Sequence, residues 1–276
     1  MSQEPAPTPG PFPYRLIATD LDGTLLRPDD TVSPRTRTAL RAACARGAAH
    51  LIVTGRSVPW TLPVLDLLGH EGLAVCGQGA QVYHAGERRM LTSVTLDRQL
   101  ARLALARIEE SVGPLALAVS RDGVDGEVLV APEYREQDGS LPSRPLQDRE
   151  QVYAEPVNKL YIQHPRLDND ALGRAAREAA GDLVSVTVSG PDIVELLPLG
   201  LSKARGLAMA ARRLGVRAAE TLAFGDMPND IPMFAWAAHG VAMDNAHPEL
   251  RSVADEITAS HEEDGIAVVL EKLLAR

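Results

Sequence analysis

The sequence predicts an α/β fold: a doubly wound, mostly parallel sheet into which a smaller α+β unit is inserted. Short apolar runs alternate with segments of helical periodicity from residue 14 to about residue 84, which is typical of a parallel sheet covered on both faces. The same alternation resumes at about residue 194, whereas the stretch between changes character. With 276 residues, 45% of them hydrophobic, the chain can bury a core of this size.

Strands and helices alternate in the first part of the chain. Ser33 provides an N-cap and Pro34 a first helical position for the first helix, which Gly47 ends. A glycine-rich turn at residues 77–79 follows the third strand. The expected strands are residues 15–19, 49–53 and 73–76 with a short run at 81–84, and the expected helices are residues 34–46 and 58–68.

The middle of the chain predicts a compact α+β unit followed by a return to the parallel sheet. Its expected strands are residues 115–120, 127–130, 158–164 and 184–189, its helices are at about residues 96–110 and 167–180, and residues 132–151 form a polar surface loop. We expect a core of residues 14–84 and 194–276, an inserted unit of residues 85–193, and a disordered, proline-rich extension of residues 1–13.

The last part repeats the alternating pattern. Ser202 can cap a helix that ends near Gly215. Expected strands at residues 221–225 and 239–243 flank a helix at 231–237, and residues 265–274 have apolar side chains at helical spacing.

Composition limits the class of partner. A net charge of −9 argues against general binding to nucleic acid or anionic membranes, because both require a basic face. The two cysteines, Cys44 and Cys76, lack metal-type spacing, which favours free thiols in a reducing compartment. No apolar run approaches the length of a membrane span, and residues 1–13 lack the segments of a signal peptide. We expect a cytoplasmic monomer or homodimer that binds a small molecule.

The stretch Asp20-Leu21-Asp22-Gly23-Thr24 stands where the first buried strand ends. Two carboxylates so close together repel each other, and burial raises their pKa values unless a cation lies between them. Mg²⁺ prefers such oxygen ligands, together with phosphate oxygens and water. By itself the stretch is equally compatible with an acidic turn, since Asp and Gly are common turn residues.

Fold logic brings further polar residues to the same edge of the sheet. Ligands of an open parallel sheet bind outside the carboxyl ends of its strands, and Asp20, Thr54 and Asp226 each follow an expected strand. The loop after Asp226 adds Asn229 and Asp230, although a turn with a helix N-cap would explain these two as well. Four acids in one crevice, counting Asp22, require a metal ion.

Lys203 and the segment Thr54-Gly55-Arg56 add groups that can hold an anion. Lys203 lies in the first turn of its helix, where its charge adds to the positive end of the helix dipole and needs a nearby anion. Thr54 and Gly55 offer a hydroxyl and exposed backbone amides to a phosphate oxygen. Arg56 can contact phosphate or substrate, but an arginine at a surface turn is more often solvated.

In order, these segments resemble the motifs of the haloacid dehalogenase superfamily of phosphatases, and within it the Cof-type hydrolases with a large type IIB cap. Residues 20–26, 52–56, 200–203 and 225–230 resemble its four motifs. The resemblance covers nearly the whole chain after residue 13 and implies a Rossmann-like core with the cap between motifs two and three. Gln78 stands where this group usually has Asn, and Asp244 where Gly is usual.

The resemblance implies a two-step phosphoryl transfer. Asp20 would attack phosphorus to form an aspartyl-phosphate, and Asp22 would act as acid and then as base. Mg²⁺ would be held by the Asp20 and Asp226 carboxylates and the Asp22 backbone carbonyl, with Asp230 orienting its water ligands. The remaining implied contacts to substrate phosphate come from Thr54, Gly55, Arg56, Lys203 and Asn229.

The expected activity is therefore Mg²⁺-dependent hydrolysis of a small phosphorylated metabolite such as a sugar phosphate. A phosphomutase using the same nucleophile is an alternative, and it would require an arginine cluster in the cap to retain its intermediate. Arg121, Arg135 and Arg144 lie in the cap but form no recognisable pattern. A catalytically silent metabolite-binding or regulatory protein is the third possibility, although such members should lose Asp20 or Asp22.

Overall fold

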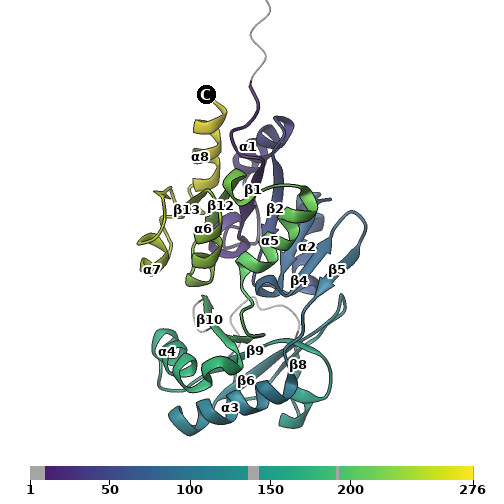
Figure 1. The fold of residues 1–276 in the computed structure, drawn as a ribbon, viewed down its shortest axis with the longest axis vertical. Coiled ribbons are helices and arrows are strands. Elements are labelled where there is room, and N and C mark those ends of the chain that lie inside the picture. The colour runs from purple at the N-terminus through teal and green to yellow at the C-terminus, as the bar shows by residue number, and fades with distance from the viewer. Residues whose placement is uncertain (1–9, 136–142, 191–192, 276) are drawn as a thin grey trace, which may run out of the picture.

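The strands of the protein form two sheets, joined by segments that cross between them (Figure 1). The computed structural model describes residues 10–135, 143–190 and 193–275. One sheet has eight strands in the order β14-β13-β12-β1-β2-β3-β4-β5, and the other has six in the order β10-β11-β9-β6-β7-β8. The expected α/β fold with an α+β insertion is confirmed.

The first sheet is parallel from β14 through β3, and β4 and β5 then pair antiparallel at its edge. Its strands are β1 (Leu16–Thr19), β2 (Ala49–Val53), β3 (Leu73–Cys76), β4 (Gln81–His84), β5 (Arg89–Ser93), β12 (Thr221–Gly225), β13 (His239–Ala242) and β14 (Glu256–Ile257). Strand β1 lies between β2 and β12, so the carboxyl ends of these three strands lie side by side.

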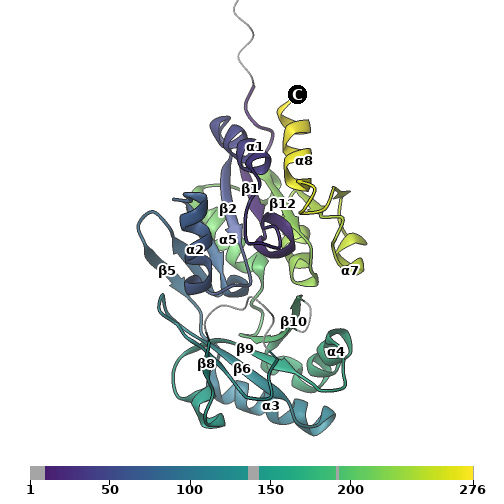
Figure 2. The same ribbon diagram turned by 180° about the vertical axis from the view of Figure 1, so that it is seen from behind.

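Helices cover both faces of this sheet (Figures 1 and 2). Ile17 of β1 packs into the apolar cluster that includes α1 (Pro34–Ala45), α2 (Val58–Leu68) and α8 (Gly265–Leu274). Leu16 and Ala18 pack on the other side, with α5 (Lys203–Leu214), α6 (Ile231–Trp236) and α7 (Pro248–Arg251). Burial on both faces explains why these strands read as continuous apolar runs without alternation.

Within the described ranges, helices cover one face of the second sheet. Its strands are β6 (Ala116–Arg121), β7 (Val128–Val130), β8 (Arg144–Pro145), β9 (Val157–Gln163), β10 (Ser185–Gly190) and β11 (Ile193–Leu197), and its helices are α3 (Arg98–Val112) and α4 (Asn169–Ala180). Leu117 and Val119 pack under these helices. Side chains alternate along a strand, so Ala118 takes the opposite face, which is turned toward the first sheet (Figure 2).

Several short strands were not predicted. Strand β5 belongs to the first sheet although it follows the boundary expected at residue 84, and β11 belongs to the second although most of it follows residue 193. Strands β8 and β14 have two residues each, too few to show a period in the sequence. The division into domains at 84 and 193 stays a prediction.

The expected N-terminal extension and surface loop lie only partly within the described residues. Residues 1–9 and 136–142 lie outside them. Phe12, expected in a disordered segment, is instead buried, and its backbone N–H donates to the Arg46 carbonyl at 3.1 Å. Within residues 132–151, a two-residue strand, β8, pairs with β7. Among helices in the described ranges, none is long and apolar enough to cross a bilayer.

Two glycines let α5 lie close to the sheet. A Cβ on Gly206 would lie 2.3 Å from Val75 Cγ1, and one on Gly79 would lie 2.2 Å from the carbonyl oxygen of Ser202. The Ser202 hydroxyl accepts the backbone N–H of Arg205 at 3.4 Å, so the predicted N-cap is confirmed. These contacts fix the first turn of α5, which carries Lys203.

Replacing Gly206 with alanine should therefore destabilise the protein. In a free helix the change would stabilise by about 0.5–1 kcal/mol, but here overpacking should lower the free energy of unfolding by about 1–3 kcal/mol. Urea unfolding followed by circular dichroism measures whether the free energy of unfolding falls or rises. Ala204→Gly, on a neighbouring half-buried position, should cost only about 1 kcal/mol of helix propensity. A more stable Gly206→Ala variant would contradict the close packing.

Candidate active site

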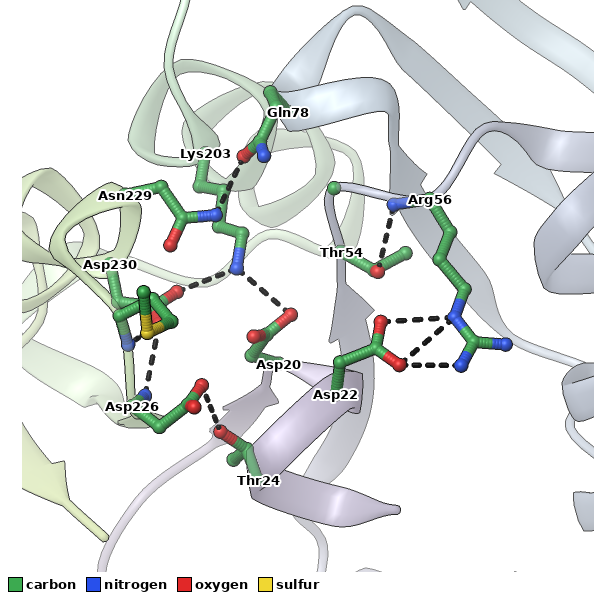
Figure 3. A network of polar contacts seen from close by, with 12 residues as sticks. Asp20, Asp22, Thr24, Thr54, Arg56, Gln78, Lys203, Asp226, Asn229 and Asp230 are labelled. Carbon is green, nitrogen blue, oxygen red and sulfur yellow. Dashed lines mark hydrogen bonds and ion pairs between the residues drawn. The ribbon is translucent and has the colours of Figure 1, made fainter. Parts of the chain in front are cut away.

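The carboxyl ends of β1, β2 and β12 bring the predicted polar residues together (Figure 3). Asp20 follows β1, Thr54 follows β2 and Asp226 follows β12, while Lys203 begins α5 next to them. These residues were expected to converge because of the order of strands and loops, and in the structure they do. Chain segments about 200 residues apart in sequence thus form one group, as the hydrogen bond between Thr24 and Asp226 illustrates.

Lys203 bridges two carboxylates. Its Nζ lies 2.8 Å from Asp20 Oδ1 and 2.7 Å from Asp230 Oδ1 (Figure 3). The lysine side chain is fully buried, as is that of Asp230. The second oxygen of Asp230 accepts the backbone N–H groups of Asp226 at 3.0 Å and of Met227 at 3.1 Å. Both oxygens of Asp230 are therefore engaged, and this residue orders the loop that follows β12.

Asp226 is held against the turn that follows β1. Thr24 Oγ1 donates to Asp226 Oδ1 at 3.2 Å. Gly23 has a φ of +69°, and a Cβ there would lie 2.2 Å from Asp226 Oδ2. Only glycine fits both the left-handed backbone and the close approach of the carboxylate. Gly23 is thus needed to bring Asp226 beside Asp20.

Negative charge exceeds positive charge among the buried side chains of this group. Ligand oxygens of Asp20, Asp226 and Asp230 lie within 4.8 Å of one another. Burial raises the pKa of Asp20 to about 7, against the attraction of Lys203. Burial, with the neighbouring Asp20 and Asp230, raises the pKa of Asp226 well above its ordinary value. Three carboxylate groups beside one ammonium group give an excess of formal negative charge that a further cation would balance. An all-oxygen donor set suits a hard divalent ion.

Asp22 lies apart from this group and pairs with Arg56. Arg56 Nε donates to Asp22 Oδ2 at 2.9 Å, and its Nη2 donates to both Asp22 and Asp30, the latter at 2.7 Å. The Asp22 side chain is 55% exposed, in contrast to the buried Asp20. Arg56 was expected to contact phosphate, and the structure gives it two carboxylate partners. Its role toward substrate stays a prediction.

Thr54 and Gly55 follow β2, and Asn229 belongs to the segment that follows β12. The buried Thr54 hydroxyl accepts the backbone N–H of Arg56 at 3.1 Å. Asn229 Nδ2 donates to Gln78 Oε1 at 3.0 Å, and a Cβ on Gly55 would lie 2.5 Å from Gln78 Nε2. Gln78 has a φ of +60°, a backbone region where Asn is enriched. This conformation explains why Asn suits the position and shows that Gln78 fills it while reaching Asn229.

The other departure from the family pattern lies at the surface. Asp244 Oδ1 accepts a hydrogen bond from Arg251 Nη1 at 2.9 Å, and its side chain is 61% exposed. The pairing stays outside the cluster of Asp20 and Lys203.

A cavity of about 430 Å³ lies between these residues and the open face of the second sheet. Asp20, Asp22, Gly55, Arg56, Lys203 and Asn229 line it on the side of the first sheet. On the other side it is lined by residues of the second sheet, among them Ala118, Val128, Lys159, Tyr161 and Glu195. The cavity is therefore a cleft between the two sheets: polar residues at the carboxyl ends of the first sheet form its floor, and residues of the second sheet form the wall opposite.

Sequence reasoning missed several of these contacts. Thr24 lies within the first acidic stretch, but its hydrogen bond to Asp226 was not predicted. Nothing in the sequence indicates that Asp30 is a partner of Arg56. Lys159 and Glu195 enter the cleft from different strands of the second sheet. Their meeting depends on strand order, which the sequence does not contain.

Comparison with known proteins agrees with the motifs. A model of the haloacid dehalogenase-like hydrolase family matches residues 17–270. The chain belongs to this family. The resemblance to haloacid dehalogenase phosphatases of the Cof type is confirmed, as is the prediction of a phosphatase.

Two relatives of this hydrolase family are named for their substrates. A protein of Serratia proteamaculans named HMP-PP phosphatase is 31% identical over 246 residues, covering 88% of this chain and 89% of its own. The 5-amino-6-(5-phospho-D-ribitylamino)uracil phosphatase YwtE of Bacillus subtilis is 28% identical, covering 95% of this chain and 98% of its own. A solved phosphatase of the haloalkanoate superfamily from Bacteroides thetaiotaomicron is 26% identical, with a TM-score of 0.78 and 98% and 99% coverage.

Removing the ammonium of Lys203 should destabilise the protein in a pH-dependent way. In Lys203→Met, measured in EDTA, the free energy of unfolding should fall by about 3–5 kcal/mol at pH 8, because buried carboxylates lose their cation. Lys203 opposes the rise in the pKa of Asp20, so without it this pKa rises further. A carboxyl with a raised folded pKa loses stability as pH rises, so the deficit should be smaller at pH 5.

Urea unfolding at both pH values provides the measurement. Lys272→Met is the matched control, because the Lys272 side chain is 58% exposed and its Nζ lies 3.1 Å from Glu256 Oε1. This variant should change the free energy of unfolding by about 1 kcal/mol or less. A deficit of equal size at pH 5 and pH 8 would show that the carboxylates do not depend on Lys203.

Proposed function

We propose that the protein is a magnesium-dependent phosphatase that hydrolyses a small phosphorylated metabolite through an aspartyl-phosphate on Asp20. The observation that carries this proposal is the buried Lys203 ammonium, 2.8 Å from Asp20 and 2.7 Å from Asp230, on the floor of a cleft. A fixed cation beside a carboxylate suits an anionic substrate whose charge must be stabilised.

Asp20 and Asp226, with the backbone carbonyl of Asp22, would hold the metal ion. When bound, a divalent cation supplies positive charge that offsets the repulsion between a carboxylate nucleophile and a phosphate. The excess of buried carboxylates over ammonium groups supports this assignment. Asp230 would not bind the metal ion directly, because its two oxygens already accept hydrogen bonds from Lys203 and two backbone N–H groups. It would instead orient the water ligands of the metal ion.

The chemical steps use residues that line the cleft. Asp20 attacks phosphorus, the bond to the leaving oxygen breaks, and Asp22 gives that oxygen a proton. Asp22 then takes a proton from a water molecule that attacks the aspartyl-phosphate, which releases phosphate and restores Asp20. Arg56 holds the Asp22 carboxylate through two nitrogen atoms, which restricts its orientation at the cleft.

Phosphoryl oxygens would be held by the Thr54 hydroxyl, the Gly55 backbone N–H and Lys203. Asn229 lines the same cleft and would contact phosphate or orient Lys203. A cavity of about 430 Å³ suits a ligand of the size of a metabolite. The names of the two relatives support a phosphorylated small molecule as the substrate class, and a sugar phosphate is one compound of this class.

The phosphomutase alternative receives little support from the cap arginines. Arg121 Nη2 donates to the Gln151 carbonyl at 3.0 Å, and Arg144 lies 2.8 Å from Glu127. Of these three arginines only Arg135 lines the cleft. Conversion of a hexose 1-phosphate to its 6-phosphate without net phosphate release would favour the mutase instead.

Wild-type protein with Mg²⁺ should release phosphate from members of a panel of sugar phosphates, nucleotides, pyridoxal phosphate, flavin mononucleotide and p-nitrophenyl phosphate. Asp20→Asn should lower the rate by about a thousandfold or more, because it removes the nucleophile. Asp66→Asn, an exposed carboxylate 2.8 Å from Arg88, should retain the wild-type rate. Undiminished hydrolysis by Asp20→Asn would sink the mechanism.

Mg²⁺ should also stabilise the folded protein without any substrate. At about 100 times its dissociation constant, an ion that binds only the folded state adds about 2.7 kcal/mol, which a thermal unfolding scan detects as a higher midpoint. Asp226→Asn should abolish this increase, whereas Asp66→Asn should keep it. An increase of the same size in Asp226→Asn would exclude Asp226 as a ligand.

A further inference from the structure

A buried ion pair lies in the wall of the cleft that the second sheet provides. Lys159 and Glu195 are 1% and 2% exposed, and Lys159 Nζ lies 2.6 Å from Glu195 Oε1. Both residues line the same cleft as Asp20 and Lys203. The phosphoryl-transfer steps use neither of them, so the pair needs another explanation.

Strand geometry directs this pair toward the cleft. Leu160 and Ile162 of β9 pack under α3 and α4, so Lys159 and Tyr161, which alternate with them, take the opposite face. Glu195 of β11 is the register partner of Tyr161. The pair and the aromatic ring therefore lie together on the face that is turned toward the first sheet.

The lysine of this pair is anchored next to the proposed phosphate site. Lys159 Nζ donates to the backbone carbonyl of Gly55 at 2.6 Å as well as to Glu195. It also stands 4.6 Å from the centre of the Tyr161 ring. Gly55 directly follows Thr54, so the pair lies near the phosphate end of the cleft and not at its far end.

One carboxylate oxygen of Glu195 has an unused capacity to accept a hydrogen bond. Its Oε2 is buried and has no hydrogen-bond partner among the described residues. A buried acceptor without a donor costs free energy, and a buried ion pair adds little stability compared with apolar residues of the same size. Packing alone therefore gives no reason for this pair, whereas a ligand that brings a hydrogen-bond donor would satisfy the free oxygen.

We propose that Glu195 is a specificity-determining residue that accepts a hydrogen bond from a hydroxyl or amino group of the leaving group. Lys159 positions Glu195 and links it to Gly55, and Tyr161 offers an aromatic surface beside it. The preferred substrates are then phosphomonoesters whose leaving group carries a donor close to the ester bond. This inference rests on the proposed phosphatase function.

The test compares Glu195→Gln with wild type on matched substrates. Glutamine keeps the shape and can still accept from Lys159, but it presents N–H groups where the free acceptor was. The probes are glucose 1-phosphate and glycerol 3-phosphate, each with its 2-deoxy analogue, in which the missing hydroxyl is on the carbon next to the ester carbon. The last probe is p-nitrophenyl phosphate, whose leaving group lacks a donor other than the phenol formed on cleavage.

In wild type, kcat/KM should be higher for at least one hydroxylated substrate than for its deoxy analogue. Glu195→Gln should lower kcat/KM for that substrate by about tenfold or more and for p-nitrophenyl phosphate by about threefold or less, because an unmatched polar group discriminates more strongly than a lost apolar contact. Glu150→Gln, an exposed cap carboxylate 2.7 Å from Arg102, should change neither.

A second variant keeps the test decisive if glutamine perturbs folding. Lys159→Met combined with Glu195→Leu removes both charges, so no buried charge is left unpaired, and it should lose the same preference. Equal losses on all substrates, or an unchanged ranking, would overturn the specificity role. If neither wild type nor any variant hydrolyses any compound of this set or of the earlier panel, the proposed phosphatase function fails and this inference fails with it. The two failures therefore give different results.

Discussion

The ammonium group of Lys203, held between Asp20 and Asp230, is the interaction on which the rest of the site depends. It joins the end of β1, the first turn of α5 and the loop after β12 at distances of 2.7–2.8 Å. A lysine at this end of a helix adds to the positive end of the helix dipole, so the carboxylates stabilise α5 while the lysine makes their burial tolerable. Gly79 and Gly206 contribute by letting α5 approach the sheet closely enough for this contact.

The position of these groups could be predicted because it follows from the parallel sheet. Leu16–Thr19 is buried throughout, and strands buried on both faces read as short apolar runs whose ends are easy to locate. Parallel strands point their carboxyl ends to one edge whatever their loops contain. Asp20, Thr54 and Asp226 could therefore be assigned to one site before any contact was known.

The contacts that could not be predicted depend on side chains that meet across distant segments. Arg56 pairs with Asp22 and Asp30, which precede it by 34 and 26 residues, and no periodicity or motif links Asp30 to the other two. The two-residue strands β8 and β14 are too short to carry a pattern, and β11 joins the second sheet through pairing with β9 and β10. Phe12 is likewise buried in an apolar cluster whose other members lie in distant segments, among them Leu40 and Leu270.

The Lys203 cluster and the Lys159–Glu195 pair lie on opposite sides of the cleft and differ in net charge. Under the proposed function, this difference would assign different parts of the substrate to the two sheets. On the side of the first sheet, buried carboxylates outnumber the single ammonium of Lys203, a balance suited to a metal ion and a phosphate together. On the side of the second sheet, Lys159 and Glu195 neutralise each other, so this pair adds polarity without net charge. A second phosphate group would gain nothing from such a pair, whereas a neutral leaving group with a hydrogen-bond donor would. Under the proposed function, the first sheet would therefore bind the phosphate and the second sheet would bind the leaving group.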